Sequence, residues 1–355
     1  MATPSLLRPS STAAITVKEL VDSTTLSSVP SDYIVDGFDA DSAVQDQIPT
    51  IDFSLLTSGD PLQRSDAVRE LGRACEDWGF FMVMNHGVPE KLCEAMLEAC
   101  RDFFDLPEEE KKGYSGKHVL DPIRCGTSFN LAVEKVRCWR DYFKVFVHPQ
   151  FHSPEKPPGL REVSSEYVTR IRGVVKELLK GVCESLGLES NYMEKALEVD
   201  EAGLQILTGN LYPPCPQPHL SMGLPPHSDH GLLTVLFQNG IDGLQVRHDD
   251  KWVHVKHLPG SLLVNIGDHL EIISNGKYKS VLHRAVVNGA TTRISIAVAH
   301  GPSMDTVVTP APRLVDGENP RSAYRGMRYG DFLDYQQSNP LNGKSVLDLI
   351  RVQTQ

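Results

Sequence analysis

The sequence predicts an α+β fold, in which helices dominate the first half of the chain and a β core dominates the second. Before residue 187, apolar residues recur at spacings of three and four, as they do on one face of a helix. After it, short strand-like runs alternate with Gly, Pro and Asn, a pattern typical of a double-sheet jelly roll or barrel. The composition, 40% hydrophobic and 23% charged, is that of an ordinary globular protein, and we find no internal repeat or low-complexity tract.

The length of 355 residues exceeds what one compact core usually holds, so we expect one large domain with added segments, or two domains. The expected segments are an N-terminal arm over 1–47, an N-terminal region over 48–160, a long helix and connector over 161–200, the jelly-roll domain over 201–303 and a C-terminal extension over 304–355.

Each predicted helix of the first half has one apolar face, and Gly or Pro stands near its ends. The expected elements are a short helix near 15–23, a strand at 48–53, a helix over 61–78 ended by Gly79, a strand at 80–84, a second helix with Leu92, Met96, Cys100 and Phe103 facing inward, a solvated charged turn at 108–112, an irregular region over 113–160 and the longest helix over 164–186.

The second half is predicted to hold short strands. Prolines end the first of them after Tyr212, because proline lacks the N–H that a sheet needs. The expected strands are 204–212, 232–238, 244–247, 251–255, 261–266, 281–287 and 293–299.

Charge and cysteine usage exclude several classes of protein. The net charge is −11 without long blocks of one sign, which argues against nucleic acid or anionic membranes as partners. No apolar run approaches the length of about 20 residues that a membrane span needs. Seven cysteines without a secretory signal indicate reduced thiols. Residues 1–14 are rich in Ser, Thr and Ala, faintly like a transit peptide, but a helical pattern resumes at 15–21. We expect a cytoplasmic monomer that binds a small molecule.

His227 and Asp229 stand two residues apart, so in an extended backbone both side chains point to the same face and can bind one metal ion. His283 precedes another apolar run and completes the set. Two histidines and one carboxylate leave three positions open on an octahedral ion, the geometry of non-haem Fe(II) oxygenases. Taken alone, His283 can also be a packed core histidine.

The chain holds a second His-x-Asp sequence, His248-Asp249-Asp250, so this motif alone is weak. The second copy lies between two strand-like runs and is predicted to be the polar tip of a hairpin. Only the copy at 227 is followed by a distant histidine and an Arg-x-Ser sequence.

Arg293 and Ser295 form a second same-face pair, on a strand-like apolar segment. A buried arginine needs an anionic partner, and no acidic residue stands near it in sequence. A ligand carboxylate is one candidate, and a salt bridge from elsewhere in the chain is the other. Tyr212, with Asn210 on the same face, can donate to the same anion or can be a core aromatic residue. His269 is a candidate supporting residue behind the metal, in a stretch that is also typical of a turn.

The combined motifs resemble those of plant Fe(II)/2-oxoglutarate-dependent dioxygenases of specialised metabolism, such as flavanone 3-hydroxylase and anthocyanidin synthase. The resemblance extends from about residue 48 to 335. The chain departs from the family pattern at Leu211, where a tyrosine is frequent, and at Ala299, where several flavonoid-acting relatives have an aromatic residue. The motifs that carry the resemblance are Ile48-Pro49-Thr50-Ile51-Asp52, Trp78-Gly79-Phe80-Phe81, Asn85-His86-Gly87-Val88, Asn210-Leu211-Tyr212-Pro213-Pro214-Cys215-Pro216, His227-Ser228-Asp229, Ile266-Gly267-Asp268, Ser274-Asn275-Gly276-Lys277-Tyr278, His283-Arg284 and Arg293-Ile294-Ser295.

This resemblance implies a distorted double-stranded β-helix core (jelly-roll, cupin-like) with flanking helices and the N-terminal helical region packed on it. It implies O2 as co-substrate, ascorbate as reductant, and release of succinate and CO2. The residue roles that it implies are iron ligation by His227, Asp229 and His283, and binding of 2-oxoglutarate by Arg293, Ser295 and Tyr212.

The expected activity is hydroxylation, desaturation or demethylation of a small, largely apolar plant metabolite, such as a flavonoid or another phenylpropanoid. The substrate pocket is expected to be lined by 120–146, around Phe129 and Phe143, and by Ala299. A hormone-modifying oxygenase is the alternative within the class. A zinc hydrolase or a non-catalytic ligand-binding protein on the same fold is the alternative outside it.

Overall fold

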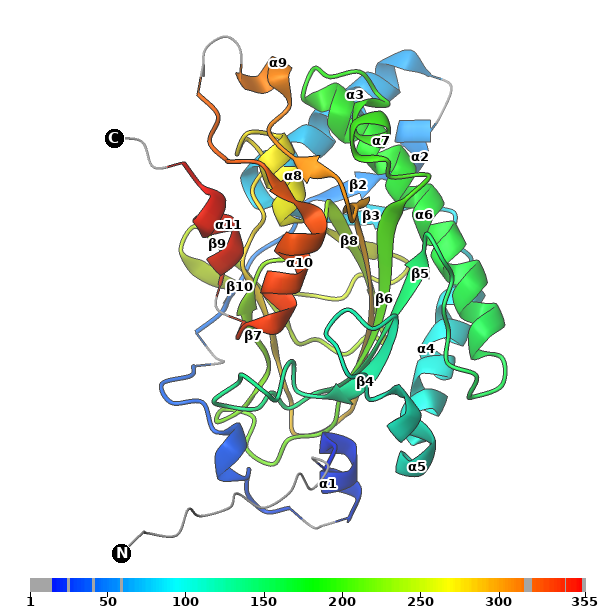
Figure 1. Ribbon diagram of the computed structural model, residues 1–355, viewed down its shortest axis with the longest axis vertical. Helices are drawn as coiled ribbons and strands as arrows, with labels where there is room; N and C mark the ends of the chain where they lie inside the picture. Colours follow the sequence, from blue (N-terminus) through cyan, green and yellow to red (C-terminus); the bar gives the residue numbers. More distant parts are fainter. Residues whose placement is uncertain are drawn as a thin grey trace, which may run out of the picture.

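The computed structural model describes residues 15–23, 26–39, 42–57, 60–315, 321–341 and 343–352 (Figure 1). The stretch 1–14, with its transit-peptide-like composition, lies outside the described residues. The chain forms two β-sheets flanked by helices, so the expected α+β fold with a jelly-roll core is confirmed.

The major sheet has eight strands in the order β2-β3-β11-β8-β13-β6-β5-β4. All neighbours in it are antiparallel except β2 and β3. Its strands are β2 Thr50–Asp52, β3 Phe80–Met84, β4 Ile123–Thr127, β5 Asp141–His148, β6 Gly203–Tyr212, β8 Leu233–Gln238, β11 Leu262–Ile266 and β13 Arg293–Ser303.

The minor sheet has five strands in the order β1-β10-β9-β12-β7. The turn between β9 and β10 holds Asp249 and Asp250 at φ values of 46° and 60°, which confirms that the second His-x-Asp sequence is a hairpin tip. The strands are β1 Val44–Gln45, β7 Met222–His227, β9 Leu244–His248, β10 Lys251–Val255 and β12 His283–Val286; β14 Val307–Val308 and β15 Met327–Arg328 form a separate pair.

The long helices pack against the outer face of the major sheet, and in Figure 1 α3, α6 and α4 run along one flank while α10 and α11 lie on the other. The helices are α1 Val17–Ser23, α2 Phe53–Thr57, α3 Pro61–Arg73, α4 Glu90–Asp105, α5 Glu108–Lys111, α6 Leu160–Ser185, α7 Tyr192–Leu197, α8 Asp268–Ile273, α9 Pro312–Val315, α10 Tyr329–Ser338 and α11 Ser345–Ile350. Short 3₁₀ turns occupy Ser31–Tyr33 and Lys112–Tyr114, and a π-helical turn over Ala74–Trp78 continues α3 to Gly79, whose φ of 63° ends it.

The main hydrophobic core lies between the major sheet and α3, α4 and α6. Leu71, Met96 and Leu178 enter it from these helices, and Phe81 and Ile296 enter it from the sheet; all five are fully buried. Alternate residues of the same strands point the other way, toward the minor sheet. The helices therefore bury one face of the major sheet and leave the other face free to line a cavity.

Two expectations for the first half are wrong. The region 113–160 is not irregular, because it contains β4 and β5, and β5 pairs with β6 inside the major sheet. The charged stretch 108–112 is not a solvated turn. It begins with α5, and Lys111 is buried, donating from Nζ to the carbonyl of Phe104 and pairing with Glu108 at 2.6 Å.

All seven cysteines are unpaired thiols. Among the described helices, none combines the length and the apolar character that crossing a bilayer requires.

Candidate active site

The pairing of β7 with β12 brings His227 and His283 directly opposite each other. Their ring centroids are 4.2 Å apart, although the residues are far apart in sequence. β7 ends at His227, so Asp229 lies just beyond the strand rather than on it. The loop that follows still turns its carboxylate toward both rings.

The three side chains form the one group of potential metal ligands found among the described residues, with ligand atoms all within 4.8 Å of one another. The Nε2 atoms of His227 and His283 lie 3.8 and 3.6 Å from Oδ1 of Asp229. Each Nδ1 contacts a backbone carbonyl, that of Pro225 at 2.8 Å and that of Val281 at 3.2 Å. A protonated Nδ1 donates to these carbonyls and leaves Nε2 with a lone pair facing the shared centre, as metal binding requires.

The surroundings favour the protonation states that bind metal. Burial, and next the charge of His283, lower the pKa of His227 to about 3, so its ring is neutral near pH 7. Burial alone would raise the pKa of Asp229, but the charges of His283 and His227 lower it overall. Two imidazole Nε2 atoms and one carboxylate fit a divalent ion such as Fe(II).

Neighbours of the triad hold Asp229 in place. Asn265 of β11 donates to its Oδ2 at 2.9 Å, and the backbone N–H of Asp268 donates to its carbonyl at 2.7 Å. His269 does not line the cavity. Its Nδ1 contacts the carbonyl of His230 and its ring packs edge-on against Tyr329, so it supports the loop after Asp229 from behind.

The wall opposite the triad is built from alternate residues of two neighbouring strands. The register pairs Arg293 with Tyr212 and Ser295 with Asn210, and continues with Ala297 opposite Thr208 and Ala299 opposite Ile206. All eight side chains line one cavity, which also contains the triad and has an empty volume of about 980 Å³, open solvent at its mouth included. The period of two along each strand thus places Arg293, Ser295 and Tyr212 together, as the sequence predicts.

Arg293 is 2% exposed and forms no ion pair with any described residue. Its Nε and Nη2 donate to Oε1 of Gln238, at 3.2 and 2.8 Å, and its guanidinium lies 5.1 Å from the ring centroid of Tyr212. Burial lowers its pKa. Oγ of Ser295 accepts from Asn210 at 3.2 Å and is free to donate into the cavity. A buried guanidinium without a carboxylate partner is costly, so this corner of the cavity suits an anion.

The expected substrate lining is only partly right. Phe129 and Ala299 line the cavity. Phe143 does not: it is fully buried among Phe103 and Phe104 in the main core, on the opposite face of β5.

Several lining residues were not named from the sequence. Arg140 and Lys144, on β5 and the residue before it, fall within the expected range 120–146, but Gln336, Gln337 and Leu341 come from the C-terminal segment, outside that range. The period-two pattern of Asp141–His148, with Phe143, Val145 and Val147 all buried on one face, is the signal from which β5 could have been found. No pattern in the sequence predicts that α10 lies next to the metal ligands.

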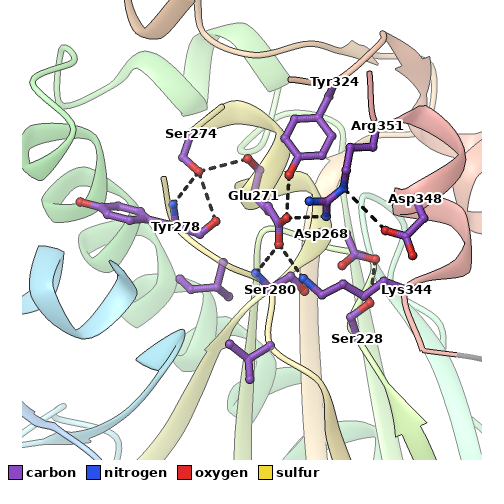
Figure 2. Close-up of polar contacts among 12 residues, drawn as sticks. Ser228, Asp268, Glu271, Ser274, Tyr278, Ser280, Tyr324, Lys344, Asp348 and Arg351 are labelled. Carbon is purple, nitrogen blue, oxygen red and sulfur yellow. Dashed lines mark hydrogen bonds and ion pairs between the residues drawn. The ribbon is translucent and has the colours of Figure 1, made fainter. Parts of the chain in front are cut away.

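The C-terminal segment covers the triad. Gln336 donates to the carbonyl of Ser228 at 3.2 Å, the N–H of Gly343 donates to that of Pro226 at 3.2 Å, and Lys144 donates to the side chain of Gln337. Figure 2 shows the polar cluster that fastens this segment to α8. At its centre, Glu271 accepts from Tyr324, Lys344, Arg351 and the N–H of Ser280, at 2.6, 2.8, 3.2 and 2.7 Å.

Replacing Lys344 by Met is expected to destabilise the protein by roughly 1–3 kcal/mol, because Glu271 is fully buried and loses a charged donor. Urea denaturation measures the loss, and limited proteolysis reports whether the C-terminal segment loosens. Lys256→Met, at an exposed position on the connection after β10, is the matched control and should leave both unchanged.

The difference in stability between wild type and Lys344→Met should depend on pH, because it follows from the pKa of Glu271. Burial opposes ionisation, but Lys344 and Tyr324 hold the pKa below its ordinary value. The resulting stability is fully present above the unfolded pKa of about 4.3 and is lost as pH falls through the folded pKa. The gap between wild type and Lys344→Met should therefore shrink below about pH 4. An equal gap at pH 7 and pH 3 would contradict this role of Glu271.

Comparisons with known proteins agree with the geometry. The family model of the 2OG-Fe(II) oxygenase superfamily matches residues 198–302, and that of the N-terminal region of non-haem dioxygenases in morphine synthesis matches residues 48–165. The chain is 54% identical over 310 residues to 2-oxoglutarate-dependent dioxygenase 19 of Oryza sativa subsp. japonica, covering 87% of this chain and 91% of that protein. The chain belongs to the 2OG-Fe(II) oxygenase superfamily.

Further relatives place it among plant members of this superfamily. It is 39% identical over 310 residues to flavanone 3-dioxygenase 2 of Oryza sativa subsp. japonica, which covers 86% of this chain and 88% of that one. The crystal structure of JOX2 in complex with 2OG, Fe and JA superposes with a TM-score of 0.86 at 32% identity, over 96% of this chain and 98% of that one. The protein is a 2-oxoglutarate-dependent dioxygenase, and its cofactor and co-substrate are Fe(II) and 2-oxoglutarate.

Proposed function

We propose that this oxygenase hydroxylates a small plant metabolite, with His227, Asp229 and His283 as the ligands of Fe(II). The observation that carries the proposal is the convergence of these three ligand atoms inside one cavity with a buried guanidinium that has no carboxylate partner in the described chain. A metal site alone would suit many reactions. A metal site beside an unpaired buried arginine suits a dicarboxylic keto acid as co-substrate.

Arg293, Ser295 and Tyr212 are proposed to bind the distal carboxylate of 2-oxoglutarate. Gln238 holds the guanidinium from one side, so the remaining N–H groups face the cavity. The Ser295 hydroxyl lies beside it on the same strand, and the Tyr212 ring supports its face. When bound, Fe(II) and 2-oxoglutarate would supply the oxidising chemistry with O2 as the oxidant: one oxygen atom goes to succinate, CO2 is released, and the other oxygen atom goes to the substrate. The chain's own residues orient the substrate and exclude water.

The substrate class is proposed from the cavity and the relatives. Phe129, Ile206, Leu224 and Leu341 give the cavity an apolar part, which suits the hydrocarbon body of a small metabolite. Flavanone 3-dioxygenase 2, a relative at 39% identity, acts on a flavonoid as its name states. Desaturation and demethylation use the same site, and a hormone-modifying role is the alternative within the class.

The alternatives outside oxidation receive less support. A zinc hydrolase needs a carboxylate base near the metal in addition to its ligands. Among the described residues lining the cavity, Asp229 is the one carboxylate, and it belongs to the triad. A non-catalytic binding protein has no need for a complete set of ligands.

The test is turnover by protein purified without oxygen, supplied with Fe(II), ascorbate, labelled 2-oxoglutarate and a plant metabolite extract, and then exposed to O2. We expect succinate formation that depends on the extract, a product heavier by one oxygen atom, and loss of both when a chelator removes the metal. A product lighter by two hydrogens would indicate desaturation, and one lighter by CH2 demethylation. Hydrolysis of an extract component with Zn(II), without succinate, would refute the proposal.

A further inference from the structure

Two cationic side chains line the cavity from the β5 side, two strands away from Arg293 across the sheet. Arg140 directly precedes β5 and is 4% exposed, and Lys144 is half-buried on the strand, opposite Thr208 of β6. Thr208 in turn pairs with Ala297 of β13. The backbone of Lys144 thus lies two strands and four residues away from that of Arg293, roughly 10 Å across the sheet and roughly 13 Å along it.

Neither side chain forms an ion pair with a described residue, although the charge of Asp229, a triad member, acts on Lys144. Nε of Arg140 is buried without a hydrogen-bond partner, and its guanidinium lies 4.9 Å from the ring centroid of Tyr142. Nζ of Lys144 donates to the amide oxygen of Gln337 and lies 5.9 Å from the ring centroid of Phe129. Burial, and next the charges of Arg124 and Arg140, lower the pKa of Lys144 to about 7. Such a pair is costly to bury unless an anion joins it.

The cofactors do not supply this anion. Fe(II) brings two positive charges and 2-oxoglutarate two negative ones, while Arg293 and Asp229 cancel each other. The site is then formally neutral before Arg140 and Lys144 are counted. The whole chain has a net charge of −11, so an overall excess of basic residues does not explain why two cations line the cavity. Besides Fe(II) and 2-oxoglutarate, the cavity must hold the substrate. We therefore expect the negative group that neutralises Arg140 and Lys144 to belong to the substrate.

We propose that the substrate carries a carboxylate, which Arg140 and Lys144 bind on the β5 side of the cavity. This inference rests on the proposed function and names the substrate class of the same site. A guanidinium binds a carboxylate through two parallel hydrogen bonds, and the ammonium adds a third donor. The amide of Gln337 already orients the ammonium, and Phe129 and Leu341 are placed to pack on an apolar body. The charged end thereby fixes which carbon of the substrate faces the triad.

The test compares acids with neutral molecules of the same shape. Benzoate, phenylacetate and cinnamate are each titrated against their primary amides, by calorimetry, into the protein with Fe(II) and 2-oxoglutarate under nitrogen. We expect at least one acid to bind about 10-fold or more tightly than its amide. The inference is overturned if no acid exceeds its amide, including the case in which none binds. Tighter binding of phenyl phosphate or phenyl sulfate than of every carboxylate would also overturn it.

Variants assign the preference to the two residues. In Lys144→Met and in Arg140→Gln, the preference for acid over amide should fall to within about 3-fold, and in Lys144→Glu it should disappear. Lys256→Met, at an exposed position, should keep it. An unchanged preference in Lys144→Met and Lys144→Glu would refute the assignment even if Arg140→Gln fails to fold.

The affinity for 2-oxoglutarate is measured in parallel. If wild type fails to bind it, the proposed function fails; if it binds normally without a preference for acids, only this inference fails.

Discussion

Asp229→Asn is expected to weaken Fe(II) binding by more than about 100-fold and to abolish 2-oxoglutarate turnover, since even partners outside the ligand shell are worth about 10–100-fold in metal affinity. The amide has the shape of the carboxylate but no charge, so two neutral rings would face the ion without a compensating anion. Asn265 donates to Oδ2 of Asp229 and can donate equally well to an amide oxygen. The fold should therefore survive. Calorimetry with Fe(II) under nitrogen measures the affinity, and succinate release measures the turnover.

The chain supplies a matched control in its second His-x-Asp sequence. Asp250 stands two residues after His248, as Asp229 does after His227, but its side chain is fully exposed at the hairpin tip. Asn is well tolerated at its φ of 60°. Asp250→Asn should leave Fe(II) affinity and turnover unchanged. If Asp229→Asn kept its Fe(II) affinity within about 10-fold of wild type, the proposed ligand set would be wrong.

The core of the site could be predicted from sequence because each part has a local signal. His227 and Asp229 are close neighbours, and Arg293 and Ser295 share one face of a strand with a period of two. The sequence does not say which strands pair. The opposition of His283 to His227 depends on β12 joining β7, and the opposition of Arg293 to Tyr212 on β13 joining β6.

The rest of the cavity was harder to predict, because its charged residues contradict local rules even where a strand has a period of two, as β5 does. β5 begins at Asp141, a buried carboxylate inside a strand, where a charge argues against a buried sheet. Its carboxylate is satisfied by the N–H groups of Val17 and Lys18, at 2.9 and 2.7 Å, from the distant arm. Lys144 is tolerated on the same strand because it faces a cavity. Such contacts become visible only once the chain is folded.

Arg293→Lys is expected to weaken 2-oxoglutarate binding by roughly 10–100-fold, the equivalent of one charge-assisted hydrogen bond or slightly more. A guanidinium has five N–H donors, of which Gln238 takes two, so the others, beside the Tyr212 hydroxyl, are left for a ligand carboxylate. Lysine keeps the positive charge but has no planar fork, and it cannot hold Gln238 and both carboxylate oxygens in one geometry. Calorimetry with the Fe(II)-loaded protein under nitrogen measures the affinity, and the KM for 2-oxoglutarate should rise in parallel.

Arg284→Lys is the matched control, because Arg284 is another buried arginine that donates to a glutamine, Oε1 of Gln245 at 2.7 Å, but it does not line the cavity. This variant should lose stability and keep its affinity for 2-oxoglutarate. A second readout tests the distal carboxylate alone, because 2-oxovalerate has a methyl group where 2-oxoglutarate has that carboxylate. Wild type should bind 2-oxoglutarate much more tightly than 2-oxovalerate. In Arg293→Lys this preference should be smaller. If both variants retained the wild-type preference, the buried guanidinium of Arg293 would serve the packing of β13 and Gln238 rather than the co-substrate. The carboxylate anchor would then have to be sought elsewhere along the same wall, where Arg140 and Lys144 are the remaining cations.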